Sequence, residues 1–95
     1  MEILSSPIEF EWDKHNTEHV GKHKVKPGEC EQVFFNIPLT VKIDLVHSRG
    51  EERYFALGKT NMGRTLVVIF TLRKTRIRVI TARDTNKKER ISHET

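Results

Sequence analysis

The side chains best suited to chemistry in this chain are arginines and lysines, most of which lie in its second half. A guanidinium group stays charged and grips a phosphate through two parallel hydrogen bonds. Such groups can hold a scissile phosphate and stabilise the negative charge that it gains in the transition state. The candidates for this catalytic role are Arg83, Arg73, Arg53, Lys59 and Arg64. The residues expected to bind the rest of a nucleic acid, RNA in particular, are Arg76, Arg78, Lys87, Lys88 and Arg90.

Acidic residues in this basic half are too dispersed to form the carboxylate cluster of a two-metal nuclease. They are Glu51, Glu52, Asp84, Glu89 and Glu94. A Gly-rich phosphate loop and a serine or cysteine nucleophile arrangement are also missing. Any nuclease here is therefore predicted to need no metal and no cofactor, with the RNA 2′-hydroxyl as nucleophile. The candidates for a general acid or base are His23 and Glu52.

Three histidines, His15, His19 and His23, are spaced four residues apart, which places them on one face of a predicted helix. Zinc can use this geometry, but an acidic partner or a nearby cysteine is not evident. A structural or interface role for these histidines is the stronger interpretation, a direct role in chemistry is the alternative, and no metal site is predicted. Cys30 is the only cysteine, so no internal disulfide can form, and a buried lone thiol is usually inert.

The charge of the chain is unevenly placed along its length. Residues 1–48 hold five lysines or arginines and eight acidic residues, a net charge of −3, while residues 49–95 hold twelve and five, a net charge of +7. A field of one sign attracts nucleic acid, although surface arginines can also serve only solubility. No secretory signal and no apolar run of about 18 residues is seen, so a cytoplasmic protein without a membrane partner is predicted.

The periodicity of apolar residues predicts one small α+β domain over residues 1–95, in the order β-α-α-β-β-β-β-α, with residues 1–7 loosely held. Helices are expected on one face of a mainly antiparallel sheet. The predicted helices are Lys14 to Lys22, capped by Asp13; a second from Pro27, with Cys30, Val33 and Phe34 facing the sheet; and a third from Asn86. The predicted strands are Ile8 to Trp12, Leu39 to Leu45, Arg53 to Lys59, Thr65 to Leu72 and Arg76 to Arg83.

The predicted strand from Thr65 to Leu72 has apolar residues at both its odd and its even positions, which is typical of a central strand covered on both faces. Alternation along strands then groups some of the candidates. Arg73 shares a face with Thr71, and Arg53 shares one with Lys59. If Arg83 faces the open side of its strand, Arg78 is expected to point the other way.

Two sets of residues give the chain a resemblance to the BrnT toxins, which are RelE-like members of type II toxin–antitoxin systems. The first set is Phe10-Glu11-Trp12-Asp13, His15-Asn16, Glu18-His19-Val20, Lys22-His23, Val25, Pro27, Glu29 and Val33-Phe34. The second is Glu52-Arg53-Tyr54, Ala56, Gly58, Gly63-Arg64, Leu66, Val68, Thr71, Arg73, Ile77-Arg78-Val79-Ile80, Ala82-Arg83-Asp84 and Lys88-Glu89-Arg90.

The resemblance implies a ribonuclease that stops translation by cutting RNA. It also implies an antitoxin of the BrnA kind that holds the enzyme inactive, and a complex that binds operator DNA. The alternative is a non-catalytic module that binds nucleic acid or only its antitoxin.

Overall fold

The structure is a computed structural model that describes residues 8–46 and 50–94, with side chains up to residue 91. The order of elements is the one predicted. The strands are β1 (Glu9–Glu11), β2 (Thr40–Asp44), β3 (Arg53–Lys59), β4 (Thr65–Arg73) and β5 (Arg76–Asp84). The helices are α1 (Lys14–Lys22), α2 (Pro27–Val33) and α3 (Lys87–Glu94). The expectation for residues 1–7 falls outside the described part.

The five strands form one sheet in the order β1-β5-β4-β3-β2. The pairs from β2 to β5 are antiparallel, whereas β1 runs parallel to β5. The mainly antiparallel sheet is thus confirmed, with β4 at its centre and β2 at an edge. Its β3–β4 turn is closed by Gly63, whose φ of 87° favours glycine. The partner of β1 could not be predicted, because three residues carry no signal for register.

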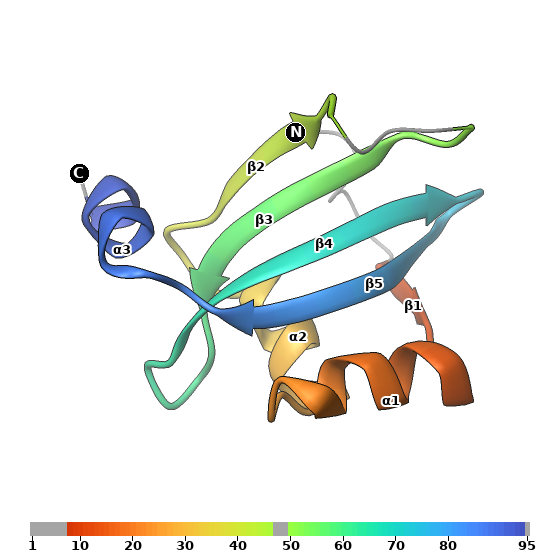
Figure 1. Cartoon of the computed structure of the whole chain (residues 1–95), viewed down its shortest axis with the longest axis horizontal. Helices are drawn as coiled ribbons and strands as arrows, with labels where there is room; N and C mark the ends of the chain where they lie inside the picture. Colours follow the sequence, from red (N-terminus) through yellow and green to blue (C-terminus); the bar gives the residue numbers. More distant parts are fainter. Residues whose placement is uncertain (1–7, 47–49, 95) are drawn as a thin grey trace.

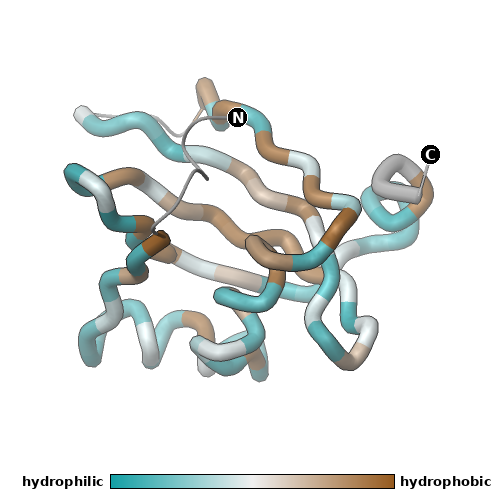
Figure 2. Tube along the Cα trace, turned by 180° about the vertical axis from the view of Figure 1, so that it is seen from behind, coloured by the Kyte–Doolittle hydropathy of each residue, from teal (hydrophilic) through white to brown (hydrophobic). Residues whose placement is uncertain are grey.

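Two helices, α1 and α2, lie on one face of the sheet, α1 against β5 and α2 against β3 and β4 (Figure 1). The core between these helices and the sheet is formed by residues such as Val20, Val33 and Phe70, which have 0% exposure. Seen from behind, hydrophobic segments run along the central strands, while α1 is mainly hydrophilic (Figure 2). The predicted one-sided packing is confirmed for these helices. The third helix differs, because α3 stands beyond the ends of β3 and β5 (Figure 1).

Local contacts fix α1 and α2 at the places that matter for the site. Asp13 caps α1 as predicted, and the Asn16 side chain donates to the carbonyl oxygens of Glu11 and Val79 at 2.9 Å each. These bonds hold the first turn of α1 against β5. The helix α2 lies so close to β3 that a Cβ on Gly58 would come within 2.9 Å of Val33 Cγ1. Only glycine fits this position without a shift of α2.

A β-bulge in β5 overturns the predicted parity of Arg78 and Arg83. Ile69 pairs with Thr81 and Phe70 pairs with Val79, so Ile80 is an extra residue on β5. The extra residue reverses the alternation, and Arg78 lies on the same face as Arg83. This face, which α1 and α2 leave uncovered, is called the open face below. The predictions that Arg53 shares a face with Lys59 and that Arg73 shares a face with Thr71 are confirmed, because the register between β3 and β4 has no irregularity.

The central strand is covered on both sides only in part. Val67 and Val68, which point to opposite faces, both have 0% exposure, as predicted for a strand covered on both faces. Ile69, on the open face, is only half-buried. The open face is therefore accessible next to Ile69.

Candidate active site

The antiparallel arrangement of β3, β4 and β5 divides the predicted catalytic residues between the two ends of the sheet. Arg53 begins β3 and Arg73 ends β4, so they lie at one end of the sheet, called the near end, which also holds the start of β5. Lys59, Arg64 and Arg83 lie at the other end, called the far end, about 20 Å away along the strands. The structure thus does not bring the five candidates into one site.

At the far end, Arg64 is held by three segments of the chain. Its Nε and Nη2 donate to the two carboxylate oxygens of Asp84 at 2.7 and 3.1 Å. Its Nη1 donates to the Lys24 carbonyl at 2.8 Å and to Glu29 Oε1 at 3.1 Å. The hydrogen bond from Arg64 lowers the pKa of the Asp84 carboxyl below its ordinary value. With these partners Arg64 joins α2 and the loop before it to the sheet, which favours a structural role.

Arg83 also has a carboxylate partner at this end. Its Nη1 and Nη2 donate to Glu89 of α3 at 2.9 and 3.0 Å, which lowers the pKa of the Glu89 carboxyl. Glu89 and Asn86 form a capping box at the start of α3, the helix predicted from Asn86. Arg90 donates to the Thr85 carbonyl at 2.8 Å, whereas Lys87 and Lys88 are exposed on α3. Arg83 and Arg90 therefore serve to attach α3.

At the near end, three arginines line one pocket of about 190 Å³ on the open face. Arg53, Arg73 and Arg78, from three adjacent strands, form what we call the arginine cluster. The pocket is also lined by His15, Asn16, Glu51, Thr71, Val79 and Ile80. The antiparallel meander of β3, β4 and β5 brings these cations together, because the start of β3, the end of β4 and the start of β5 lie side by side.

Two members of the cluster differ in how firmly they are held. Arg78 Nη1 lies 3.0 Å from Glu11 Oε2 and 2.9 Å from Asp13 Oδ2, and its side chain is only 12% exposed. The hydrogen bond from Arg78 lowers the pKa of the Asp13 carboxyl. Arg73 makes longer contacts, 3.5 Å to Glu11 and 3.6 Å to Glu51, and is 49% exposed. Arg78 is thus fixed, while a phosphate could displace the partners of Arg73.

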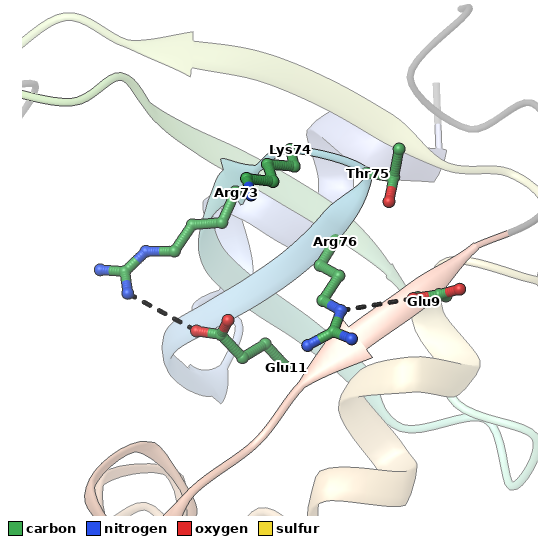
Figure 3. A pocket seen from close by; sticks show the side chains of 6 residues that line it. All are labelled: Glu9, Glu11, Arg73, Lys74, Thr75 and Arg76. Atoms are coloured by element: carbon green, nitrogen blue, oxygen red, sulfur yellow. Dashed lines mark hydrogen bonds and ion pairs between the residues drawn. The ribbon is translucent and has the colours of Figure 1, made fainter.

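A second hollow, of about 520 Å³, adjoins the cluster and shares Arg73 with it. It lies between β1 and the β4–β5 turn and is lined by Glu9, Glu11, Arg73, Lys74, Thr75 and Arg76 (Figure 3). Arg76 is exposed there and makes a 3.3 Å contact with Glu9 (Figure 3). The predicted RNA-binding residue Arg76 therefore lies next to the arginine cluster.

Comparison with known proteins adds to this geometry. The family described as "Ribonuclease toxin, BrnT, of type II toxin-antitoxin system" matches residues 12–89. The chain belongs to the BrnT family. A crystal structure of the Brucella abortus ribonuclease toxin, BrnT, is 19% identical and superposes with a TM-score of 0.58, over 85% of this chain and 100% of that one. This likeness confirms the fold. No match was found among curated proteins.

The two candidate acid–base residues of this BrnT-family chain, His23 and Glu52, do not line the pocket of the arginine cluster. His23 caps the far end of α1, about 12 Å along the helix from His15. The Glu52 carboxylate accepts a 2.8 Å hydrogen bond from the Tyr54 hydroxyl, and Tyr54 packs against the core. In their place, His15 and Glu51 line the pocket of the arginine cluster.

His15 and Glu51 were not predicted as acid–base candidates from the sequence, and the reason differs between the two. In the sequence, His15 is one of three histidines on a helix face, and Glu51 is one of several dispersed carboxylates. The parallel pairing of β1 with β5 sets the first turn of α1 beside Arg78, and this brings His15 into the pocket. Glu51 lies two residues before Arg53, and alternation along the extended chain would have placed both on one face. That signal was available in the sequence.

The three histidines of α1, His15, His19 and His23, do not form a metal centre in the described structure. Neighbouring rings are 6.4 Å apart, centroid to centroid, for His15 with His19 and for His19 with His23. Within residues 8–46 and 50–94, no group of three His, Cys, Asp or Glu side chains has a metal-binding arrangement. Cys30 is buried as predicted, and burial raises the pKa of its thiol to about 12. Such a thiol is a poor nucleophile.

Proposed function

We propose that this BrnT-family chain is an endoribonuclease whose active site is the pocket of the arginine cluster. The observation that carries the proposal is the convergence of Arg53, Arg73 and Arg78 with a histidine and a carboxylate in one pocket. Family membership supports the reaction class, because the family is described as ribonuclease toxins. The chain has no helix among its described residues that is both long and apolar enough to cross a membrane.

In this proposal the cluster binds the scissile phosphate. Arg73 gives up its long contacts to Glu11 and Glu51 and donates to the phosphate oxygens, since the exposed pairs are worth little in water. Arg78 stays with Glu11 and Asp13 and keeps the pocket in shape. Arg53, at the start of β3, faces the same pocket. Once the phosphate is bound, these positive charges are in place before the reaction and stabilise the transition state.

The reaction is a transfer of the phosphoryl group within the RNA, and it needs no metal. A base, Glu51 or His15, takes the proton of the 2′-hydroxyl, and the 2′-oxygen bonds to phosphorus while the bond to the 5′-oxygen breaks. The leaving 5′-oxygen takes a proton from the other of these two residues or from water. The products are a 2′,3′-cyclic phosphate and a 5′-hydroxyl end. The arginines hold the two non-bridging oxygens during this exchange.

We further propose that cutting RNA in the cytoplasm inhibits translation and that a BrnA-like antitoxin neutralises the chain. Operator DNA would be bound only by the toxin–antitoxin complex. The antitoxin partner and the toxic action follow from the type II toxin–antitoxin family to which the chain belongs.

The test is production of the chain in bacteria without an antitoxin, followed by an RNA cleavage assay with EDTA. Growth arrest, cleavage that survives EDTA and cyclic phosphate ends are expected. Normal growth with soluble protein and intact RNA would favour the non-catalytic module. A strict need for Mg²⁺ or Zn²⁺ would contradict the mechanism but not the ribonuclease activity.

A further inference from the structure

We infer that Phe55 is the stacking platform of a subsite on the open face that binds one base of single-stranded RNA. This inference rests on the proposed function, because it extends the path of the RNA beyond the arginine cluster. Phe55 lies on β3 two residues after Arg53, so both side chains point to the open face. The ligand class is a nucleobase together with its flanking phosphates.

The subsite is a hollow of about 340 Å³ between the sheet and α3. Phe55 and the almost fully buried Leu57 form its apolar floor. Lys42 and Thr40, which pair in register with Phe55 and Leu57, line the β2 side. Lys88 and Glu89 of α3 line the remaining side. An apolar floor with charged groups around it suits a flat base whose backbone stays in water.

Phe55 differs from the other phenylalanines in its surroundings. Phe10, Phe34, Phe35 and Phe70 make ring contacts with each other or with Tyr54 at centroid distances of 5.0 to 6.2 Å. Phe55 makes no ring contact with any residue in the described part of the chain. It is half-buried and lines a hollow rather than the core cluster. Its ring can therefore accept a base, which stacks on aromatic side chains in proteins that bind single strands.

The charges around the hollow match a nucleic-acid ligand. Lys42 and Lys88 are exposed at its rim and can hold phosphates. The one acidic lining residue, Glu89, accepts both hydrogen bonds from Arg83, so its charge is already compensated. An RNA strand would meet positive charge here without an unpaired carboxylate.

The path from the arginine cluster to this hollow is continuous. Arg53 lines both the cluster pocket and a neighbouring hollow, and Ile69, which also lines that hollow, pairs directly with Phe55. The other residues that line this hollow are Asp44, Ile80 and Thr81. Two residues along β3 span about 7 Å. One nucleotide can bridge this distance from its phosphate at Arg53 to its base at Phe55. The nucleotide next to the scissile phosphate is thus the one that the subsite holds.

The experiment uses a short single-stranded RNA with 2′-O-methyl groups, which lacks the nucleophilic hydroxyl, and a series in which each base in turn is removed. Binding is measured for the parent chain, Phe55→Leu and Phe55→Trp. Phe55→Leu should weaken binding by about 5-fold to 150-fold, and Phe55→Trp should retain it. One abasic RNA should bind the parent chain as weakly as the intact RNA binds Phe55→Leu. The same abasic RNA should bind Phe55→Leu with no further loss of affinity. Phe35→Leu, at an exposed aromatic away from the hollow, is the matched control and should bind normally.

A second measurement needs no variant. 2-Aminopurine placed at the sensitive position of the RNA should lose fluorescence on binding to the parent chain, because stacking quenches it. Equal RNA affinity of Phe55→Leu and the parent, or no sensitive position in the abasic series, would overturn the subsite and leave the ribonuclease standing. Unchanged RNA affinity with lost antitoxin binding would assign the hollow to the antitoxin instead. A parent chain that neither binds nor cleaves RNA would overturn both proposals.

Discussion

Arg78 and Asp13 are joined by a contact of 2.9 Å between Nη1 and Oδ2, which ties β5 to the first turn of α1. Asp13 is also the N-cap of α1 and accepts a hydrogen bond from the Asn16 backbone at 3.1 Å. One carboxylate therefore both begins the helix and fixes its position on the sheet. This position brings His15, two residues further on, into the pocket of the arginine cluster.

The first prediction concerns the pH dependence of this contact. The pKa of Asp13 is lowered in the folded chain, so the stabilisation is complete above the ordinary pKa of about 4 and is lost as the pH falls through the lower folded value. Asp13→Asn keeps the cap but removes the charge. The parent should be more stable than the variant at neutral pH, and this difference should shrink below about pH 4. Urea unfolding at several pH values measures it, and a difference independent of pH would contradict the assignment.

The sequence was sufficient for the elements but not for one detail of their arrangement, the β-bulge in β5. Alternation and capping signals predicted α1 from Asp13 and the meander of β3, β4 and β5, because these depend on neighbours along the chain. The extra residue Ile80 carries no local signal, since an isoleucine fits a regular strand equally well. This bulge decides that Arg78 shares a face with Arg83. The sequence therefore indicated which residues could act, but not which of them meet.

The second prediction separates structure from chemistry at Arg64. Arg64→Ala removes charged hydrogen bonds to Asp84 and Glu29 from a side chain that is 26% exposed, and should lower the free energy of unfolding by about 2 kcal/mol. Arg76→Ala is the matched control, because its pair with Glu9 is exposed on both sides and should be worth less than about 1 kcal/mol. Urea denaturation gives both values. Below its melting temperature, Arg64→Ala should still cleave RNA at the parent rate, and a large loss of rate in fully folded protein would return Arg64 to the active site.

The third prediction tests which end of the sheet carries the chemistry. Arg73→Ala should lower the single-turnover cleavage rate by about 10²-fold or more, because a preorganised donor to the phosphate is lost. Arg83→Ala, at the other end and engaged with Glu89, should change this rate far less. Lys87→Ala and Lys88→Ala should weaken RNA binding slightly and reduce its salt dependence.

Rates for these variants must be compared at saturating RNA, so that binding does not enter. Thermal unfolding of Arg83→Ala controls for the attachment of α3. If Arg83→Ala loses the rate and Arg73→Ala keeps it, the active site lies at the end of the sheet near Lys59, and the arginine cluster is only a binding surface.

The last prediction concerns the group that takes the proton of the 2′-hydroxyl. Glu51 and His15 line the pocket of the arginine cluster, whereas Glu52 accepts a hydrogen bond from Tyr54 on the core side and His23 caps the far end of α1. Glu51→Gln or His15→Gln should lower the single-turnover rate by about 10² to 10⁴, and the more damaging of the two identifies the base. Glu52→Gln and His23→Gln are matched controls that remove the same groups outside the pocket. The pH–rate profile provides the decisive readout, because loss of the base should abolish the rise of rate with pH, whereas a change in structure alone would lower the rate equally at every pH. A parent-like profile in both Glu51→Gln and His15→Gln would exclude these two residues and assign the proton transfer to solvent or to the RNA itself.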